Sequence, residues 1–281
     1  MTERRALGSF SVAPVGLGAM QLAGPNVFGP PSDPSAAIAL LREAVDAGVD
    51  HIDTAEYYGP HVVNELIRAA LHPYPPGLAL VSKVGARRGA DGEVLRADEP
   101  EQLRRGIEDN LVTLGVEQLA VVNLRLVRDG GPDARFDDQL AAMVAARDDG
   151  LIGAIGLSNV TRAHVLHALN STELACVQNA FHLANRASWP VLEECNRCGI
   201  AFVPFAPLGS GAGSVLRAPH VVEVAHRLGC TPSQVALAWA LDVSPNVLLI
   251  PGTSSPRHLH ENLDASNVRL DDDARQRLSD I

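Results

Sequence analysis

An acid and a tyrosine stand five residues apart in the segment Gly48–Gly59. Asp53 follows the apolar run Val49–Ile52, and Tyr58 falls in what the pattern predicts to be a loop. A tyrosine hydroxyl can donate a proton to an oxygen that is gaining negative charge. Its ordinary pKa is about 10, so it is a weak acid at neutral pH. The segment therefore predicts a proton donor that needs help from neighbouring charges.

The segment Asp53–Gly59 resembles the Asp-Thr-Ala-x-x-Tyr-Gly motif of the aldo-keto reductase family and matches it without a gap. Further matches follow in order over nearly the whole chain. The resemblance implies an enzyme that reduces a small-molecule aldehyde or ketone with hydride from NADPH, while Tyr58 protonates the carbonyl oxygen. It also implies that Lys83 lies beside Tyr58 and lowers its pKa, and that Asp53 pairs with Lys83 and fixes its position.

Each of these three side chains also has an ordinary structural explanation. An aspartate at the end of a strand commonly caps a helix, a tyrosine can pack at a rim, and a lysine is usually solvated. All three nevertheless occur in the order and at the strand ends that the family motif requires. This agreement favours a catalytic role for the set.

The fourth catalytic position of the family is a histidine at the end of the fourth strand. The segment that matches it here is Val121–Arg125, and Asn123 stands in place of the histidine. An asparagine amide can donate a hydrogen bond to a substrate carbonyl, but it cannot relay a proton as an imidazole does. The resemblance therefore implies a catalytic set of Asp53, Tyr58, Lys83 and Asn123, with an altered pH dependence.

Three later segments resemble the parts of the family that hold the nicotinamide half of the cofactor: Gly156–Asn159, Val177–Asn179 and Val203–Gly211. In the family, polar side chains of the first two bond the carboxamide, while in the third an aromatic ring stacks under the nicotinamide and the loop approaches the pyrophosphate. The ordinary alternatives are a helix cap, loop hydrogen bonding and core packing. The residues that the resemblance assigns to this half are Ser158, Asn159, Gln178, Phe205, Leu208 and Ser210.

The segment Ile250–Asn262 resembles the last cofactor-binding segment of the family. The pair Ser255–Pro256 predicts the start of a helix, whose free N–H groups suit an anion such as the 2′-phosphate of the cofactor. Many relatives carry a lysine and an arginine where this chain has Gly252 and His258, so Arg257 would compensate. NADPH is favoured over NADH. The residues assigned to this half are Gly252, Thr253, Ser254, Arg257, His258 and Asn262.

The elements that must position these residues recur as short apolar runs separated by amphipathic stretches. Continuous apolar strands are expected when helices cover both faces of a parallel sheet. No Gly-x-Gly-x-x-Gly opens a helix after the first run, which disfavours a doubly wound dinucleotide-binding sheet. We expect an α/β fold, a single (β/α)8 TIM barrel over residues 1–281, with a hairpin within Leu7–Val15. The eight runs are Val15–Leu17, Val49–Ile52, Leu78–Val81, Leu119–Leu124, Ile152–Leu157, Leu174–Val177, Ile200–Val203 and Val247–Ile250.

The spacing of the candidate residues agrees with this fold. Between Asp53 and Gly252 they recur at intervals averaging about 33 residues, close to the roughly 30 residues of one strand-helix-strand unit. Each candidate therefore falls near the carboxyl end of a successive strand, where barrel enzymes assemble their sites. The helices expected between the runs include Ser35–Ala47, Glu99–Leu114, Phe136–Arg147 and Pro232–Leu241.

Composition excludes several other classes of protein. The formal net charge of −10 opposes nonspecific binding to nucleic acid. No run of about 18 apolar residues and no secretory signal pattern are present, so we expect a cytoplasmic protein without membrane contact. Cys195 and Cys198 have a Cys-x-x-Cys spacing, but they lie in an expected helix that ends at Gly199, and no second cysteine pair completes a zinc site. We expect no metal, and a monomer or weak homo-oligomer.

Within the family, the segments Gly18–Pro25, Gly85–Gly89 and Val122–Arg125 look most like the bacterial pyridoxal reductases. Pyridoxal is thus the leading substrate, reduced to pyridoxine. The alternatives are a broad-specificity aldehyde reductase and an NADPH-binding regulatory barrel with a protein partner and little turnover. Three arginines, Arg87, Arg88 and Arg125, either line the mouth and attract an anionic substrate or are simply solvated.

Overall fold

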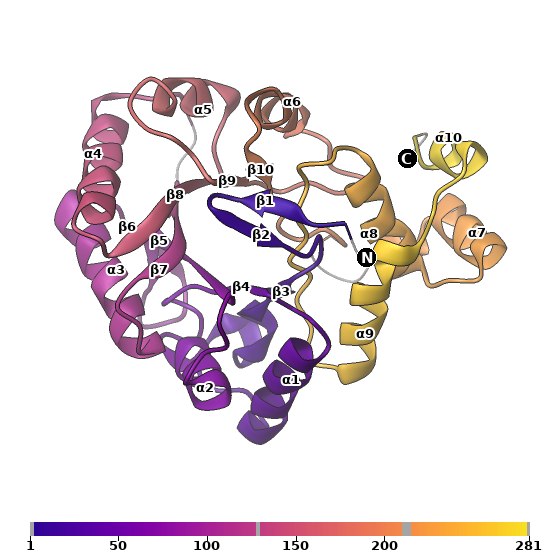
Figure 1. Cartoon of the computed structure of the whole chain (residues 1–281), viewed down its shortest axis with the longest axis horizontal. Helices are drawn as coiled ribbons and strands as arrows, with labels where there is room; N and C mark the ends of the chain where they lie inside the picture. The colour runs from indigo at the N-terminus through magenta and orange to yellow at the C-terminus, as the bar shows by residue number, and fades with distance from the viewer. Residues whose placement is uncertain (1–2, 128–129, 210–214, 280–281) are drawn as a thin grey trace.

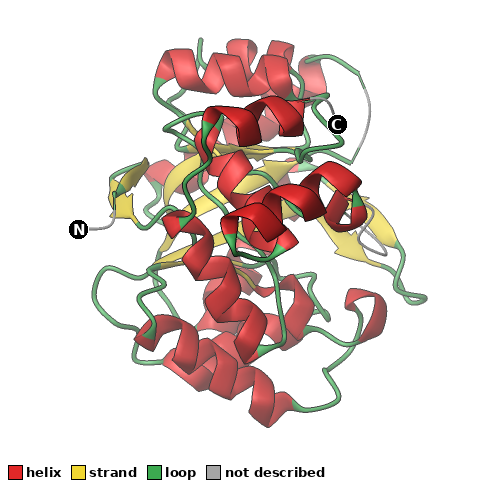
Figure 2. Cartoon of the chain, turned by 90° about the vertical axis from the view of Figure 1, so that its right-hand side faces the viewer, coloured by secondary structure: helices red, strands yellow, loops and turns green. Residues whose placement is uncertain are grey.

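The computed structural model describes residues 3–127, 130–209 and 215–279. In this part of the chain, a curled sheet of parallel strands forms the inside and helices surround it (Figure 1). Figure 2 shows the same arrangement from the side, with the strands in the middle and helices outside. The parallel strands, in the order in which neighbours pair, are β3 (Leu17–Gly18), β4 (His51–Asp53), β5 (Ala79–Arg88), β7 (Leu119–Arg125), β8 (Ile152–Ser158), β9 (Cys176–Gln178) and β10 (Ala201–Phe202).

The eighth apolar run closes the sheet without forming a regular strand. The Leu248 N–H donates to the Phe202 carbonyl at 2.9 Å, and the Gly16 N–H donates to the Leu249 carbonyl at 2.8 Å. Parallel bridges join Val247 to Phe202 and Leu249 to Val15. This run therefore links β10 to the segment that enters β3 and completes the ring. The expected (β/α)8 barrel is confirmed.

The helices follow the amphipathic stretches, and short polar or glycine residues define their ends. Asp33, Thr231 and Ser255 each accept a hydrogen bond from a backbone N–H of the following first turn. Proline stands at the start of each of these three helices, where its missing N–H costs nothing. The helices are α1 (Pro34–Asp46), α2 (Val62–Leu71), α3 (Pro100–Leu114), α4 (Ala134–Asp148), α5 (Arg162–Ala168), α6 (Trp189–Cys198), α7 (Pro219–Leu228), α8 (Pro232–Asp242), α9 (Pro256–Asp264) and α10 (Asp272–Ser279).

A hairpin of β1 (Arg5–Leu7) and β2 (Phe10–Val12) lies across one end of the barrel, in front of it in Figure 1. Leu7 and Val12 are buried in one apolar cluster with residues of the barrel interior, which include Ala79, Val81, Val121, Ala201, Val203 and Leu248. A larger cluster fills the space between the strands and the helices. The hairpin thus seals the end of the barrel at which the strands begin, and it confirms the expected hairpin.

Strand β5 differs from the expectation, because it does not end at Lys83. It continues to Arg88 and pairs antiparallel with β6 (Val94–Ala97). The residues beyond Lys83 remain extended because β6 offers them hydrogen-bonding partners. Gly85 has a φ of +103°, and a Cβ there would collide with the carbonyl of Arg125. Lys83 therefore lies within a long strand whose outer part forms a wall above the barrel.

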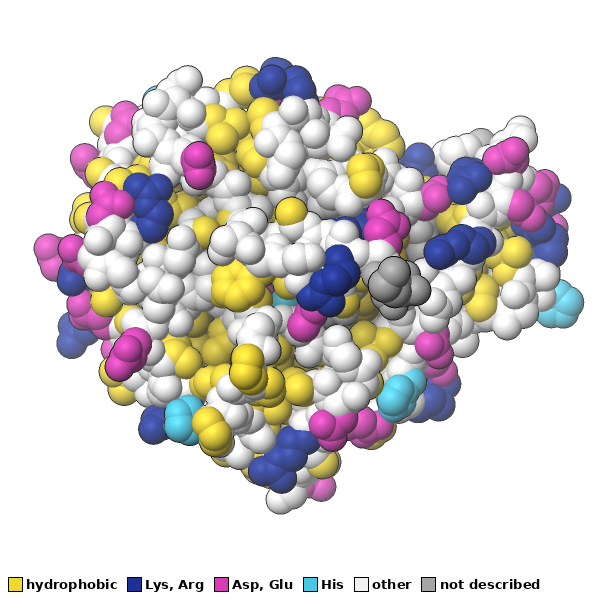
Figure 3. Space-filling view, viewed as in Figure 1, with side chains coloured by type: hydrophobic (Ala, Val, Ile, Leu, Met, Phe, Trp, Pro, Cys, Tyr) yellow, Lys and Arg dark blue, Asp and Glu magenta, His cyan; other side chains and the backbone are white. Residues whose placement is uncertain are grey.

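Among the described residues, no helix is long and apolar enough to cross a membrane. On the face shown in Figure 3, acidic and basic side chains are interspersed around the perimeter. Cys195 and Cys198 lie in α6, which ends at Gly199 in the left-handed conformation, as the sequence predicts. The described part of the chain contains no group of three or more His, Cys, Asp or Glu side chains placed to hold a metal ion.

Candidate active site

A cavity of about 540 Å³ opens at the carboxyl ends of the barrel strands. Its lining includes Arg88 and Val94 of the β5–β6 hairpin and the segment from Phe205 to Gly209. Barrel enzymes assemble their sites at this end of the strands. The wall brings together six of the residues that the sequence singled out, namely Asp53, Tyr58, Lys83, Phe205, Leu208 and Gly252.

An ion pair between Asp53 and Lys83 lies in the wall of the cavity. The two side chains come from neighbouring parallel strands, β4 and β5, and each residue is only 3% exposed. The Lys83 ammonium contacts one carboxylate oxygen of Asp53 and donates to the Thr54 carbonyl at 3.0 Å. The Gln178 amide donates to the other carboxylate oxygen at 2.6 Å. Asp53 is therefore held from two sides, and its charge is paired.

Tyr58 lies directly beside this ion pair. The Lys83 Nζ is 5.2 Å from the centre of the Tyr58 ring, and the residue is 8% exposed. Burial raises the pKa of the Tyr58 hydroxyl, and the carboxylate of Asp53 raises this pKa further. The charges of Arg125 and Arg88 lower it. The hydroxyl is thus protonated at neutral pH, and these two arginines make its anion easier to form.

Tyr57 is a second buried tyrosine in the wall, which the sequence analysis did not single out. Its ring meets the Tyr58 ring edge to face, with centroids 5.3 Å apart. Burial and the neighbouring Tyr58 raise the pKa of Tyr57 as well. Its position next to Tyr58 in the sequence could have predicted that it lies near the site. Two phenols therefore face one cavity, and a substitution of each can separate their roles.

The structure does not place Asn123 at the cavity, which corrects the expectation that its amide faces the substrate. Asn123 is in register with Lys83 but is fully buried, and it donates to the Ser82 carbonyl at 3.3 Å. The Cys176 thiol donates to its side-chain oxygen at 3.3 Å. Residues two positions apart on a strand share a face, so Arg125 occupies the same side of β7 one layer nearer the opening. Arg125 lines the cavity.

The polar residues expected at the nicotinamide, Ser158, Asn159 and Gln178, are not among the residues that line the cavity. Ser158 is in register with Gln178 and accepts a hydrogen bond from Arg125 at 3.1 Å. Asn159 has a φ of +59°, and its amide donates to the Leu126 carbonyl at 2.8 Å. Neither Ser158 nor Asn159 is the N-cap of α5, because Thr161 occupies that position. The helix-cap explanation for these two residues is therefore wrong.

Gln178 has an unsatisfied hydrogen-bond acceptor, which is the kind of group that a bound ligand can satisfy. Its amide nitrogen is bonded to Asp53, whereas its side-chain oxygen is buried and has no hydrogen-bond partner in the described part of the chain. A buried acceptor without a partner lowers the free energy of unfolding by about 1–3 kcal/mol. The N–H groups of a carboxamide would satisfy this oxygen. The residues present at this position therefore fit a nicotinamide.

Phe205 and Leu208 border the opposite side of the cavity. The Arg125 guanidinium lies over the Phe205 ring, with Cζ 5.1 Å from its centre. A flat apolar ring at this position fits the stacking role that the sequence predicts. Ser210, which the sequence assigned to the same loop, lies outside the described residues.

The expected phosphate-binding segment is at the start of α9, beyond the cavity. The Ser255 hydroxyl accepts from the His258 N–H at 3.5 Å, and the Thr253 hydroxyl accepts from the Ser255 N–H at 3.0 Å. Arg257 is exposed and forms an ion pair with Glu261. The structure thus confirms the predicted start of the helix. The remaining residues assigned to this segment, Ser254 and Asn262, flank the same turn, and Asn262 is buried.

A buried polar network behind the ion pair escaped the sequence analysis. Thr54 donates to Asn64 at 2.8 Å, and Asn64 donates to Asn110 at 2.9 Å. Ser82 donates to the same oxygen of Asn110 at 2.6 Å. The network ties the residues next to Asp53 and Lys83 to helices α2 and α3. No local pattern reveals it, because its members come from β5, α2, α3 and the loop after β4.

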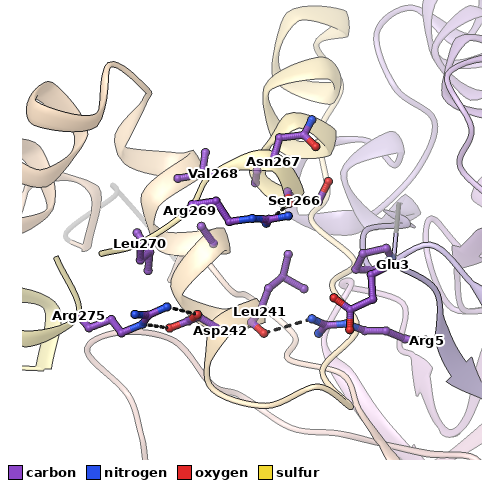
Figure 4. Close-up of a pocket in the computed structure, with 13 residues that line it drawn as sticks. Glu3, Arg5, Leu241, Asp242, Ser266, Asn267, Val268, Arg269, Leu270 and Arg275 are labelled. Carbon is purple, nitrogen blue, oxygen red and sulfur yellow. Dashed lines mark hydrogen bonds and ion pairs between the residues drawn. The ribbon is translucent and has the colours of Figure 1, made fainter. Parts of the chain in front are cut away.

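A second hollow of about 520 Å³ lies between the N-terminal hairpin, α8 and the residues before α10 (Figure 4). Several of its charged groups have partners within the chain, among them Arg5, Asp242 and Arg275. Arg275 and Asp242 face each other with two hydrogen bonds of 2.7 and 3.1 Å, and Arg5 donates to the Leu241 carbonyl at 3.3 Å. These contacts hold the hairpin and α10 to the barrel, so we assign this hollow a structural role.

Comparison with known proteins agrees with this geometry. The aldo/keto reductase family model matches residues 14–281, and the chain belongs to this family. It is an NAD(P)H-dependent oxidoreductase. Over 278 residues the chain is 48% identical to the pyridoxine 4-dehydrogenase of Escherichia coli, which covers 98% of this chain and 96% of that protein.

Solved structures show the same fold. A thermostable aldo-keto reductase in complex with the inhibitor epalrestat matches with a TM-score of 0.83 at 27% identity, over 99% of this chain and 98% of that one. The aldo/keto reductase of Klebsiella pneumoniae, solved with NADP and acetate, matches with a TM-score of 0.82 at 23% identity, over 100% and 95% of the two chains.

Proposed function

We propose that this enzyme reduces an aromatic aldehyde, pyridoxal, to the alcohol pyridoxine with NADPH, and that Tyr58 is the proton donor. The proposal rests on one observation: the wall of a single cavity at the carboxyl ends of the strands contains Tyr58, Lys83 and Asp53. The substrate follows from the 48% identity to a protein named pyridoxine 4-dehydrogenase. Such a dehydrogenase and a pyridoxal reductase catalyse the same reaction in opposite directions.

The wall of the cavity suits an aromatic substrate. Met20 and Val94 present apolar surface near its mouth and are 40% and 47% exposed, while Phe205 and Leu208 line its opposite side. An apolar pocket with a few polar groups at one end is typical of sites for small organic molecules. In this arrangement the aldehyde group would lie at the polar end, next to Tyr58.

The residues that would hold NADPH fall into two groups. Ser158, Asn159, Gln178, Phe205 and Leu208 would hold the nicotinamide half, and the start of α9, with Arg257, would bind the 2′-phosphate. A helix N-terminus favours an anion through its free N–H groups and its dipole. When bound, NADPH supplies the hydride that adds to the carbonyl carbon.

The protein's own side chains supply the proton for the carbonyl oxygen and position the charges around the donor. As negative charge develops on the carbonyl oxygen, the Tyr58 hydroxyl donates its proton to that oxygen, so the product is a neutral alcohol. Asp53 fixes Lys83 beside the Tyr58 ring, and the buried setting excludes bulk water from the acid. In the reverse direction the Tyr58 phenolate accepts the proton of the alcohol.

Two tyrosine variants form a matched pair that tests the acid. We expect Tyr58→Phe to lower kcat for pyridoxal by about 100-fold or more, because general acid catalysis contributes roughly 10²–10⁴ in rate. Tyr57→Phe removes the neighbouring hydroxyl and should retain most of the activity. NADPH binding, followed by the fluorescence of the bound cofactor, should survive in both variants. Unchanged turnover in Tyr58→Phe would remove Tyr58 as the acid.

The same assay settles the substrate when it compares pyridoxal with simple aromatic and aliphatic aldehydes, and NADPH with NADH. We expect the highest kcat/KM for pyridoxal with NADPH. Equal values across the panel would support a broad-specificity aldehyde reductase instead. Tight NADPH binding with no turnover of any aldehyde would support a regulatory barrel, and a preference for NADH would contradict the role given to the start of α9.

A further inference from the structure

Two arginines in the cavity wall have no carboxylate partner in the part of the chain that the structure describes. Among the described residues, neither Arg88 nor Arg125 forms an ion pair with a carboxylate, although both line the cavity. Arg88 donates to the Gly92 carbonyl at 2.6 Å, and Arg125 donates to the Ser158 hydroxyl at 3.1 Å. A cation that is partly buried without a counterion favours any negative charge that forms near it.

We propose that Arg125 is the electrostatic partner of Tyr58 in this cavity. The proposal rests on the proposed function, because it concerns the reaction in which Tyr58 gives up its proton. It also replaces Asn123 as the fourth member of the site. Arg125 acts through Tyr58, and we therefore class it as a positioning residue.

The strand register supports this assignment. Lys83 is opposite Asn123 on β7, and Arg125 is opposite Ser158 on β8. Because alternate residues of a strand share a face, Arg125 points to the same side of the sheet as Asn123 but lies one layer nearer the cavity. The Ser158 hydroxyl and the face of the Phe205 ring then hold the guanidinium in place. Asn123 is held below this layer by Ser82 and Cys176.

The charges around Tyr58 explain why a further cation is useful. The positive charge of Lys83 is in direct contact with the carboxylate of Asp53, and Lys83 is not among the charges that lower the pKa of Tyr58, contrary to what the resemblance implies. Burial raises the pKa of Tyr58, and Asp53 raises it further. The charge of Arg125 is unpaired among the described residues and lowers this pKa.

The test compares Arg125→Met, Arg125→Lys and Arg87→Met in the full-length enzyme with saturating NADPH. Arg87 is a matched control, because it is a neighbouring arginine that is exposed and does not line the cavity. We expect Arg125→Met to lower kcat for pyridoxal by about 10- to 100-fold, since a cation at close range shifts the pKa of an acid by roughly 1–3 units. Arg125→Lys should recover part of the loss, and Arg87→Met should match the wild type.

The pH profile separates this role from a merely structural one. Loss of the cation raises the pKa of Tyr58, so the alkaline limb of kcat should move to higher pH in Arg125→Met, and the move should be smaller in Arg125→Lys. An unchanged kcat and an unchanged profile in Arg125→Met would overturn the inference. So would a loss confined to KM for aldehydes that carry a carboxylate or phosphate, because Arg125 would then anchor the substrate.

Failure of this inference differs from failure of the proposed function. A wild-type enzyme that reduces no aldehyde overturns both. An active wild type with an unaffected Arg125→Met variant overturns only the role of Arg125. Cofactor binding by Arg125→Met, measured by fluorescence, shows that the variant is folded, so that a lower kcat supports the inference.

Discussion

At the scale of single residues, the site depends on how the charges are paired. Asp53 and Lys83 neutralise each other in the wall, and Gln178 holds the second oxygen of the carboxylate. The carboxylate of Asp53 raises the pKa of Tyr58, and the charges that lower this pKa come from Arg125 and Arg88. The chemistry of the tyrosine is thus set by Asp53, five residues before it, and by two arginines that are far from it in sequence.

The ion pair also affects stability, which Lys83→Met tests. This change leaves the buried carboxylate of Asp53 without its cation, and breaking a buried pair in this way typically costs about 3–5 kcal/mol. We expect the free energy of unfolding, measured by urea titration, to fall by about that amount. The double variant Asp53→Asn with Lys83→Met removes both charges and should lose less. An equal loss in the single and the double variant would show that packing and not charge is responsible.

At the scale of elements, helices α2 and α3 hold the strands that carry the ion pair. The network of Thr54, Asn64, Asn110 and Ser82 crosses from β4 and β5 to these helices and is buried throughout. Asn110 accepts from two side chains at once, so it is the central member. Thr54 follows Asp53, and Ser82 precedes Lys83. The position of the pair therefore depends on helix packing.

Asn110→Ala tests this dependence. It removes the acceptor of the Ser82 hydroxyl and one of the two acceptors of the Asn64 amide, which keeps its bond to the Thr113 hydroxyl, and an unsatisfied buried group costs about 1–3 kcal/mol. We expect a lower free energy of unfolding and a lower kcat for pyridoxal. Val112→Ala is a matched control on the same helix, because Val112 is 71% exposed. If Asn110→Ala kept the stability and the kcat of Val112→Ala, the network would have no positioning role.

At the scale of the whole molecule, the two ends of the barrel have separate tasks. The cavity opens where the strands end, whereas the β1–β2 hairpin covers the end at which they begin. Leu7 fills the inside of the barrel at the covered end and is 2% exposed. Stability and chemistry can therefore be changed independently.

Leu7→Ala should separate these tasks. Removal of a buried leucine side chain typically costs about 2–5 kcal/mol, part of which comes from the space it leaves. We expect thermal unfolding at a lower temperature, with kcat and KM for pyridoxal unchanged under conditions in which the variant is folded. A substitution at the half-buried Phe10 of the same hairpin, Phe10→Ala, should cost less. A change in kcat that follows the loss of stability would argue against this separation.

The sequence by itself determined the repeating elements and the core of the site. Apolar runs, amphipathic stretches and capping residues such as Asp33, Thr231 and Gly199 are local signals, and the structure confirms the elements they predict. Asp53 ends β4 and Tyr58 stands in the loop after it, which is a local signal, whereas Lys83 lies within β5 and was found from the order of the family motif. The local features depend on neighbours within a few residues, so they can be recognised without the fold.

Only the tertiary structure decided which side chains reach the cavity. Asn123 and Arg125 share one face of β7, and the alignment of β7 with β5 and β8 determines that Arg125 reaches the opening while Asn123 is buried. The continuation of β5 beyond Lys83 depends on pairing with β6. The tilt and register of the strands set the depth of each layer in a barrel. These quantities arise from contacts between distant segments, which no single stretch of sequence contains.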